Sequence, residues 1–273
     1  MEPYEAETYG ERIAGIYDDW YGGFDDATVA TLHELAQGGC ALELGIGTGR
    51  VALPLQQSGV EVHGIDASEA MIARLRAKPG GERITVSLGD FADVAVEGEF
   101  SLVYVLFNTF FALLTQDEQV RCFENVARHL SADGAFLLEV FVPDLKRFDG
   151  RQTVRAIGIG NDEVRLDISQ LDPASQQVTS QHVVLTEDGV RLYPVKLRFA
   201  WPSELDLMAR LAGLQLRLTK AGTARIPSNG GFWDDRCEGI IARLRHPWVR
   251  IGNISHHPTS VYNRSFSIAP GTP

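Results

Sequence analysis

The sequence has few cysteines, no basic excess and no long apolar run. Its three cysteines, Cys40, Cys122 and Cys237, form no C-x-x-C pair. This disfavours a disulfide framework or a zinc site, so we expect reduced thiols and predict no metal site. No apolar stretch approaches the roughly 20 residues that span a bilayer, and the acidic N-terminus lacks the features of a signal peptide. We therefore predict a soluble, cytoplasmic protein with no membrane partner.

The charge balance also argues against a nucleic-acid partner. The 273 residues carry a formal net charge of -11, with 44% hydrophobic and 22% charged residues. Proteins that bind nucleic acids usually present a basic stripe to the phosphates, and here only the segments 191–198 and 241–250 are locally basic. The composition is that of an ordinary globular protein, long enough for one large domain or two small ones.

From residue 26 to residue 142, short apolar runs alternate with amphipathic segments. The runs predict strands at 40–44, 60–65, 84–88, 100–107 and 135–142. The amphipathic segments predict helices at 26–37, 49–58, 68–78 and 116–130. Such alternation is typical of βαβ units, in which a parallel sheet is covered by helices on both faces. A further helix is predicted at 7–20, where apolar side chains form one stripe.

The pattern changes after Pro143. Residues 152–200 alternate apolar and polar side chains between turn signals, which predicts an antiparallel meander. A helix at 203–212 and a strand pair at 214–219 and 238–244 follow. We predict a single domain over residues 1–247, with a helical lid over about 1–38, a β insertion over about 150–200 and a C-terminal tail at 248–273.

The strongest motif is LELGIGTGR at residues 42–50. A predicted strand ends in glycines spaced Gly45-x-Gly47-x-Gly49, and a helix follows. Glycine permits a sharp turn and lets a cofactor approach the backbone closely. The start of the helix also offers unpaired N–H groups to a polar ligand. Glu43 lies two residues before the first glycine.

Two further acids follow predicted strands at a spacing that suits a nucleoside. Asp66 ends the next strand, 21 positions after Gly45. An acid about 20 residues after such a loop can accept hydrogen bonds from ribose hydroxyls. Asp90 and Phe91 follow the third strand, where an acid and an aromatic ring can meet an adenine. The loop and these residues together predict a cofactor that contains adenosine.

The loop disfavours a dinucleotide. The dinucleotide pattern is G-x-G-x-x-G, and Arg50 stands where its last glycine belongs. Glu43 would also repel a pyrophosphate. An acid suits a cofactor that carries an ammonium and a sulfonium, as S-adenosylmethionine (SAM) does. An NAD-dependent oxidoreductase is therefore the less favoured alternative.

The segment 42–145 resembles the class I SAM-dependent methyltransferases. E-x-G-x-G-x-G matches their first motif, GIDASEAM (64–71) the second and LGDF (88–91) the third. The segments FSLVYVLFNTFFALLTQDEQ and DGAFLLEVFVPD resemble their fourth and fifth strands. The order of these motifs is more specific than any one of them.

The resemblance implies a Rossmann-like α/β fold with a mostly parallel seven-stranded sheet and helices on both faces. The remaining layout is similar to small-molecule methyltransferases of bacterial secondary metabolism, which carry an antiparallel insertion after the fifth strand. It implies methyl transfer from SAM to a small-molecule acceptor, with S-adenosylhomocysteine (SAH) as the product. The fold alone leaves open a SAM-binding protein that does not methylate.

The resemblance also implies a set of cofactor contacts. The methionine part of SAM would meet the glycine loop, and Glu43 would orient that loop or reach the amino group. Asp66 would hold the ribose, and an aromatic residue of the N-terminal helix, Tyr17 before Tyr9, Trp20 or Tyr21, would cover the cofactor. The implied cofactor-binding residues are Tyr17, Glu43, Gly45, Gly47, Gly49, Asp66, Ala67, Met71, Asp90, Phe91 and Leu106.

Residues that could act on the acceptor follow the later strands. Methyl transfer needs a general base only where the nucleophile arrives protonated. We consider Asn108 after the fourth strand, Glu139 near the end of the fifth, and His182 in the insertion. Glu139 could instead be a carboxylate bound by backbone groups, and His182 a surface residue. The insertion could roof the acceptor or form a dimer contact, so both a monomer and a homodimer are compatible.

The loop after the fourth strand, NTFFALL, lacks a histidine found there in some amino-sugar N-methyltransferases of similar layout. An apolar or aromatic acceptor is therefore at least as plausible as an amino sugar. Transfer to oxygen, nitrogen or carbon stays open.

Overall fold

The structure is a computed structural model that describes residues 3–22, 26–223 and 238–245. The predicted tail at 248–273 and Cys237 lie outside these described residues. Within the described part, no helix combines the length and the apolar character that crossing a membrane requires.

Seven strands of the described chain form the first sheet, in the order β10-β11-β5-β4-β1-β2-β3. Its parallel strands are β1 (Ala41–Leu44), β2 (Val62–Asp66), β3 (Thr85–Leu88), β4 (Phe100–Val105) and β5 (Leu130–Phe141). The strand β11 (Glu238–Arg245) pairs antiparallel with β5, and β10 (Gln215–Thr223) pairs antiparallel with β11, so β11 alone runs against the other six strands. The parallel sheet predicted from the alternation of apolar runs and helices is confirmed.

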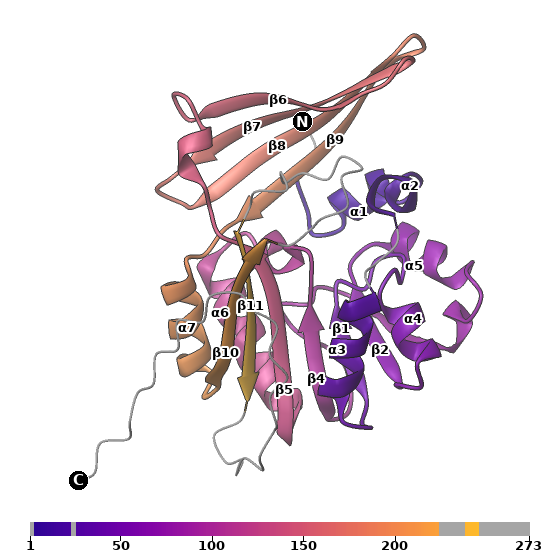
Figure 1. Cartoon of the computed structure of the whole chain (residues 1–273), viewed down its shortest axis with the longest axis vertical. Coiled ribbons are helices and arrows are strands. Elements are labelled where there is room, and N and C mark those ends of the chain that lie inside the picture. The colour runs from indigo at the N-terminus through magenta and orange to yellow at the C-terminus, as the bar shows by residue number, and fades with distance from the viewer. Residues whose placement is uncertain (1–2, 23–25, 224–237, 246–273) are drawn as a thin grey trace.

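Helices cover both faces of this sheet (Figure 1). One side carries α3 (Asp26–Ala36), α4 (Ala52–Gln57) and α5 (Glu69–Arg76), which bury leucines against β1, β2 and β4. The other side carries α6 (Gln116–His129) and α7 (Pro202–Leu211), packed on the phenylalanines of β4 and β5. The short 3-10 helices η1 (Gly81–Arg83), η2 (Thr109–Ala112) and η3 (Leu145–Arg147) lie in connecting segments.

Local sequence explains where two of these helices begin. The Thr115 hydroxyl accepts the Glu118 N–H at 3.2 Å, while the Glu118 side chain accepts the Thr115 N–H at 2.8 Å. This reciprocal capping box fixes the start of α6. Ser68 caps α5 by accepting the Met71 N–H at 3.1 Å.

A second, antiparallel sheet follows β5 and lies over the first (Figure 1). Its strands are β6 (Gln152–Ile159), β7 (Glu163–Asp172), β8 (Gln177–Thr186) and β9 (Gly189–Arg198), in that order. The predicted antiparallel insertion is thus confirmed. We call this four-stranded sheet the roof. Val184 and Tyr193 of its inner face pack with Ile13 and Trp20 of the N-terminal segment.

The prediction of one helix at 7–20 is wrong in detail. The segment forms two short helices, α1 (Thr8–Ile13) and α2 (Tyr17–Tyr21). Between them lie Gly15, a poor helix former, and Ile16, whose φ of -124° and ψ of 0° are not helical. The break lets α1 and α2 follow the space between the two sheets (Figure 1).

Candidate cofactor and acceptor site

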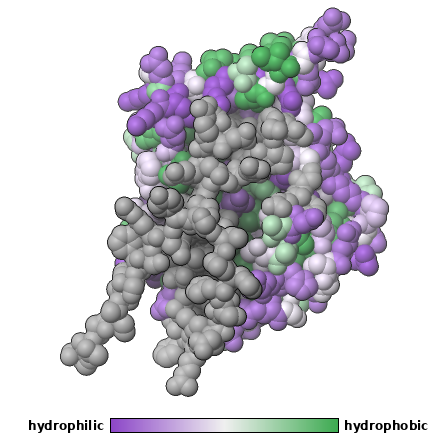
Figure 2. Space-filling model, viewed as in Figure 1, coloured by the Kyte–Doolittle hydropathy of each residue, from purple (hydrophilic) through white to green (hydrophobic). Residues whose placement is uncertain are grey.

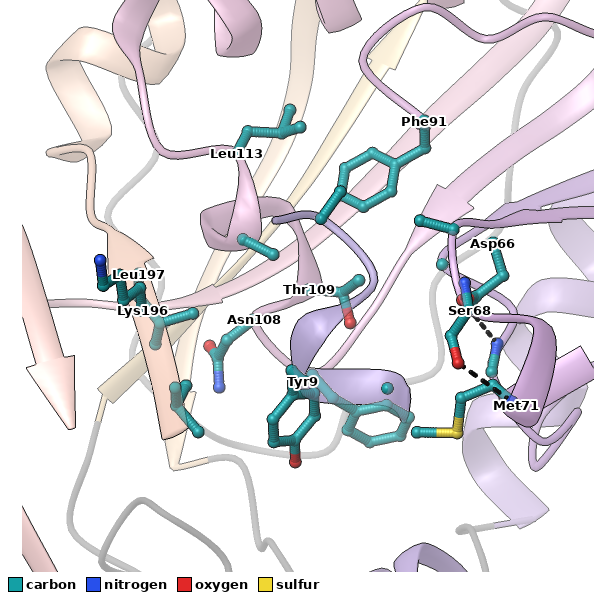
Figure 3. A pocket seen from close by; sticks show the side chains of 18 of the residues that line it. Tyr9, Asp66, Ser68, Met71, Phe91, Asn108, Thr109, Leu113, Lys196 and Leu197 are labelled. Atoms are coloured by element: carbon teal, nitrogen blue, oxygen red, sulfur yellow. Dashed lines mark hydrogen bonds between the residues drawn. The ribbon is translucent and has the colours of Figure 1, made fainter. Parts of the chain in front are cut away.

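The strand order places a crevice at one edge of the first sheet. The order reverses between β1 and β4, and ligands of open α/β sheets bind beyond the carboxyl ends of the strands at such a point. The loops that follow β1 to β4 meet α1, α2 and the roof around a cavity of about 370 Å³. Figure 3 shows Asp66, Ser68, Met71 and Phe91 toward one end and Asn108, Lys196 and Leu197 toward the other.

The three glycines of the loop have different surroundings. Gly47 lines the cavity, and an added Cβ would meet nothing within 4 Å, so its backbone leaves open space for a ligand. Gly45 also lines the cavity, but an added Cβ would lie 2.4 Å from Thr109 Cγ2. Gly49 lies outside the lining, where an added Cβ would lie 2.1 Å from Leu75 Cδ1. Gly49 has a φ of 74°, which favours glycine, and it packs on Leu75 of α5.

Asp66 fixes this loop from the end of β2. Its Oδ2 accepts the Gly47 N–H at 2.7 Å and its Oδ1 accepts the Ser68 N–H at 2.9 Å. Burial raises the pKa of Asp66, which these backbone hydrogen bonds oppose. A carboxylate has about four acceptor positions, so Asp66 keeps capacity for the two hydroxyls of a ribose.

Glu43 lies behind the loop and outside the cavity lining. It is 6% exposed, and the Tyr104 hydroxyl donates to its Oε2 at 3.0 Å. A backbone hydrogen bond also joins Glu43 to Ala52 at the start of α4. Burial raises the pKa of Glu43 to about 8, although its hydrogen bonds and the Arg50 charge oppose the shift. Of the two predicted roles, this placement favours orientation of the loop.

The remaining predicted cofactor residues mostly gather at the Asp66 end of the cavity. Ala67, Met71, Asp90 and Phe91 all line it. Asp90 Oδ1 accepts the Ala92 N–H at 2.8 Å, which sets the turn that aims Phe91. Leu106 lies instead in the core on the α3 side of the sheet, and its neighbour Phe107 lines the cavity.

The turn after β4 is strained. Phe107 (φ 55°) and Asn108 (φ 67°) adopt the left-handed conformation in succession, which non-glycine residues rarely do. The Asn108 Oδ1 accepts the Phe141 N–H at 2.6 Å. Because this bond occupies the amide oxygen, the amide nitrogen of Asn108 is the end that can donate to a ligand in the cavity.

Glu139 of β5 holds the same turn. Its Oε2 accepts the Phe107 N–H at 3.3 Å, and its backbone oxygen accepts the Asn108 N–H at 3.2 Å. Burial raises its pKa, and it lies outside the cavity lining. This placement favours the predicted alternative, a carboxylate bound by backbone groups that positions Phe107 and Asn108.

Aromatic side chains of the N-terminal helices cover the cavity. Tyr9, Tyr17 and Tyr21 all line it. The hydroxyls of Tyr9 and Tyr21 are 3.0 Å apart, and the rings of Tyr17 and Tyr21 have centroids 4.7 Å apart. Trp20, another candidate for the cover, packs instead on Tyr193 and His182 of the roof, at 5.2 and 6.0 Å between centroids.

Polar contacts tie these helices to the cofactor loops. Asp18 accepts a hydrogen bond from the Thr48 hydroxyl at 2.6 Å and pairs with Lys78 at 2.7 Å. Glu11 accepts from the Ser68 hydroxyl at 2.8 Å and from the Ala70 N–H at 3.0 Å. Helices α1 and α2, which form the lid, are therefore held to the glycine loop and to the start of α5 by hydrogen bonds and an ion pair.

Arg50 lines the cavity, a role that the sequence did not predict. In the sequence, Arg50 was used only as evidence against a dinucleotide. Its Nη1 donates to the Tyr21 carbonyl at 2.9 Å, and its guanidinium carbon lies 4.0 Å from the Phe107 ring centroid. The guanidinium thus joins the lid, the glycine loop and the strained turn. A cation at this point of the lining suits the carboxylate of an amino-acid moiety. Its position directly after the last glycine was the available signal.

The roof supplies the other end of the cavity through His182, Val195, Lys196 and Leu197. His182 is 1% exposed, so the alternative of a surface residue is wrong. Burial lowers the pKa of His182 to about 4, which keeps its ring neutral at pH 7. Farther along β9, the Lys196 N–H donates to the Tyr4 hydroxyl at 3.2 Å and ties the N-terminal segment to β9.

Comparisons with known proteins match this architecture. Residues 41–134 match the family model described as a methyltransferase domain. The chain is 30% identical over 185 residues to cypemycin N-terminal methyltransferase of Streptomyces sp, covering 67% of this chain and 76% of that protein. It is 26% identical over 198 residues to the dTDP-4-amino-2,3,4,6-tetradeoxy-D-glucose N,N-dimethyltransferase of Saccharopolyspora spinosa, covering 68% and 78%.

A solved structure extends the match over the roof. The CcbJ methyltransferase from Streptomyces caelestis is 37% identical, with a TM-score of 0.77, covering 89% of this chain and 99% of that one. The family model spans the glycine loop, Asp66, Asp90 and the strained turn, whereas this structural match also takes in the second sheet.

Proposed function

Because this chain belongs to the class I SAM-dependent methyltransferases, we propose that it methylates an amine nitrogen of a small secondary metabolite. SAM supplies an electrophilic methyl group carried by a sulfonium. One relative is named for methylation at an N-terminus, and another is named for N,N-dimethylation of an amino sugar. The amine, the acceptor class and the roles below are inferences for this chain.

The Asp66 end of the cavity fits the adenosine of SAM. Asp66 would accept the ribose hydroxyls, and the adenine would lie among Ala67, Met71, Asp90 and Phe91. The open space beside Gly47 would take the methionine chain.

Arg50 and Tyr17 extend this fit toward the reacting end. The Arg50 guanidinium would pair with the methionine carboxylate. Tyr17 has its ring centroid 5.9 Å from the Arg50 guanidinium carbon and lines the cavity beside the loop. Its aromatic face would stabilise the sulfonium by a cation–π contact.

The burial of His182, which keeps its ring neutral, is the observation that favours nitrogen as the methyl acceptor. A hydroxyl nucleophile needs a base to take its proton, and a histidine with a pKa of about 4 is a poor base. An amine needs only to bind in its neutral form, because its lone pair then reacts directly. The apolar walls Val195 and Leu197 and the cation Arg50 disfavour an ammonium ion. The neutral His182 ring can accept an N–H of the bound amine, and the Asn108 amide can orient an oxygen beside it.

Matched acceptors test the choice of nitrogen. The chain would be incubated with SAM carrying a deuterated methyl group and with pairs that differ only in an amino or hydroxyl group, including free peptide N-termini and amino sugars. We expect labelled product from amine members only, with kcat/KM rising with pH as the free amine becomes populated. A labelled hydroxyl member, or a product methylated on carbon, would contradict the assignment.

A further inference from the structure

Three consecutive residues of β9, Val195, Lys196 and Leu197, line the acceptor end of the cavity. Side chains of a strand alternate between the two faces of a sheet, so three in succession do not all point into one space. Val195 and Leu197 share the inner face of the roof with Tyr193. Lys196 belongs to the outer face, where Figure 2 shows hydrophobic residues gathered at the top of the molecule. Lys196 therefore reaches the cavity through its main chain.

The hydrogen bonds of β9 show which way its main-chain groups point. In an antiparallel ladder, the N–H and C=O of one residue face the paired strand, and those of the next residue face away from it. Just past β9, the Phe199 N–H donates to the carbonyl of Gln176, just before β8, at 3.0 Å. In the same register Val195 and Leu197 face β8, whereas both main-chain groups of Lys196 face away. Because β9 is the edge strand of the roof, the Lys196 groups face the cavity.

The edge of β9 is blocked on both sides of Lys196. Pro194 has no N–H to offer, and the Arg198 carbonyl accepts a hydrogen bond from the Gln119 side chain at 2.8 Å. At Lys196 itself, the N–H donates to the Tyr4 hydroxyl at 3.2 Å. No residue of the described part of the chain donates a hydrogen bond to the Lys196 carbonyl. The cavity wall thus presents one main-chain donor, paired with a hydroxyl oxygen, and one main-chain acceptor.

A molecule that fills the acceptor end takes water away from this carbonyl. A buried carbonyl without a hydrogen bond costs free energy, so a well-bound acceptor has to donate to it. Leu113, Val195 and Leu197 form apolar walls nearby, against which the hydroxyls of a sugar would lie unpaired. A secondary amide carries one donor and one acceptor, which match the two groups of Lys196.

We propose that the open edge of β9 binds an amide group of the methyl acceptor, which is therefore a short peptide or a peptide-like amide with a free amine. This inference rests on the proposed transfer to an amine nitrogen. The acceptor N–H would donate to the Lys196 carbonyl, and an acceptor carbonyl would replace the Tyr4 hydroxyl on the Lys196 N–H. Main-chain bonds of this kind hold peptides at sheet edges. The open edge is one residue long, which suits a small acceptor.

Matched peptides test the proposal on the full chain. Tripeptide amides varied at their first two positions would be incubated with SAM carrying a deuterated methyl group, beside a set of amino sugars, and the products identified by mass spectrometry. We expect labelled peptides. In the best peptide, each amide would then be replaced in turn by an ester, which keeps the amine but removes one N–H. One of these replacements should lower kcat/KM by about tenfold or more, mainly through KM.

Lys196→Pro is the matching change in the protein. Proline removes the N–H that faces the cavity and leaves the hydrogen bonds to β8 in place. Compared with Lys196→Ala, which loses the same side chain but keeps the N–H, it should lower kcat/KM for the peptide by about tenfold or more. Leu192→Pro is the control, since Leu192 faces away from β8 on the same edge but lies outside the cavity lining. Titration with SAH would show that each variant retains a folded cofactor site.

The outcomes separate this inference from the proposed function. Methylation of amino sugars but of no peptide would overturn the inference and leave transfer to an amine standing. The inference would also fail if every ester form reacted as well as the parent peptide, or if Lys196→Pro matched Lys196→Ala. Transfer to no amine of either kind, by a chain that still binds SAH, would overturn the proposed function and this inference with it.

Discussion

Replacing Asp66 with alanine tests the cofactor half of the site. Asp66 has two tasks, because it accepts the N–H groups of Gly47 and Ser68 and would also accept the two ribose hydroxyls of SAM. Alanine removes both. The glycine loop loses its anchor, and the hydroxyls lose their ionised acceptor.

The size of the effect follows from these bonds. A hydrogen bond to a charged group contributes about 1.5–3 kcal/mol, so the loss of the two ribose bonds alone costs about 3 kcal/mol. At 25 °C that corresponds to a rise of roughly 150-fold in the Kd for SAM or SAH. A less ordered loop would add to it.

Isothermal titration calorimetry with SAH measures this change directly. Asp93→Ala is the matched control, since Asp93 forms an ion pair with Arg121 at 2.8 Å, with both side chains well exposed, and lies outside the cavity lining. We expect the control to bind like wild type. An Asp66→Ala variant that binds within threefold of wild type would refute the assignment of this carboxylate.

Three further predictions concern residues around the loop. Burial raises the pKa of Glu43 to about 8 in the folded state, whereas its ordinary pKa is 4.5. Between these two pH values the folded state holds a proton that the unfolded state has lost. The free energy of unfolding should therefore fall as pH rises through this range, by up to about 1.4 kcal/mol per pH unit. Urea unfolding at pH 5, 7 and 9 should show that Glu43→Gln flattens this dependence; an unchanged slope would contradict the burial argument. Arg50→Lys keeps the charge but loses the planar fork, so calorimetry should show SAH binding about tenfold weaker, and full affinity would argue against a carboxylate pair. If Glu139 only positions Phe107, Glu139→Gln should retain kcat while Glu139→Ala lowers it at least tenfold; equal losses in both would indicate a base.

The sequence predicted most of what local chemistry controls. The strands around the glycine loop and the spacing from Gly45 to Asp66 follow from apolar runs and turn residues, and the structure brings Gly45, Gly47 and Asp66 to one cavity. The sequence did not predict the break near Gly15. The apolar stripe continues across this position, and a single residue of low helix propensity does not interrupt it.

The remaining features depend on contacts distant in sequence. Alternation assigned His182 to one face of a strand but could not tell which face points inward. Glu139 reaches a backbone N–H 32 residues away, and Arg50 reaches the carbonyl of Tyr21. No local pattern encodes such contacts. The predicted domain limits stay predictions, and the tail lies beyond the described residues.

The central claim is that this cavity delivers the SAM methyl group to nitrogen. Its most direct test is incubation of the chain with SAM labelled by 13C in the methyl group and a 15N-labelled small-molecule extract of the organism that makes it, followed by NMR of the product. We predict one small molecule whose new methyl carbon is bonded directly to 15N. A labelled methyl on oxygen or carbon, or no transfer from SAM to any molecule of the extract, would contradict it.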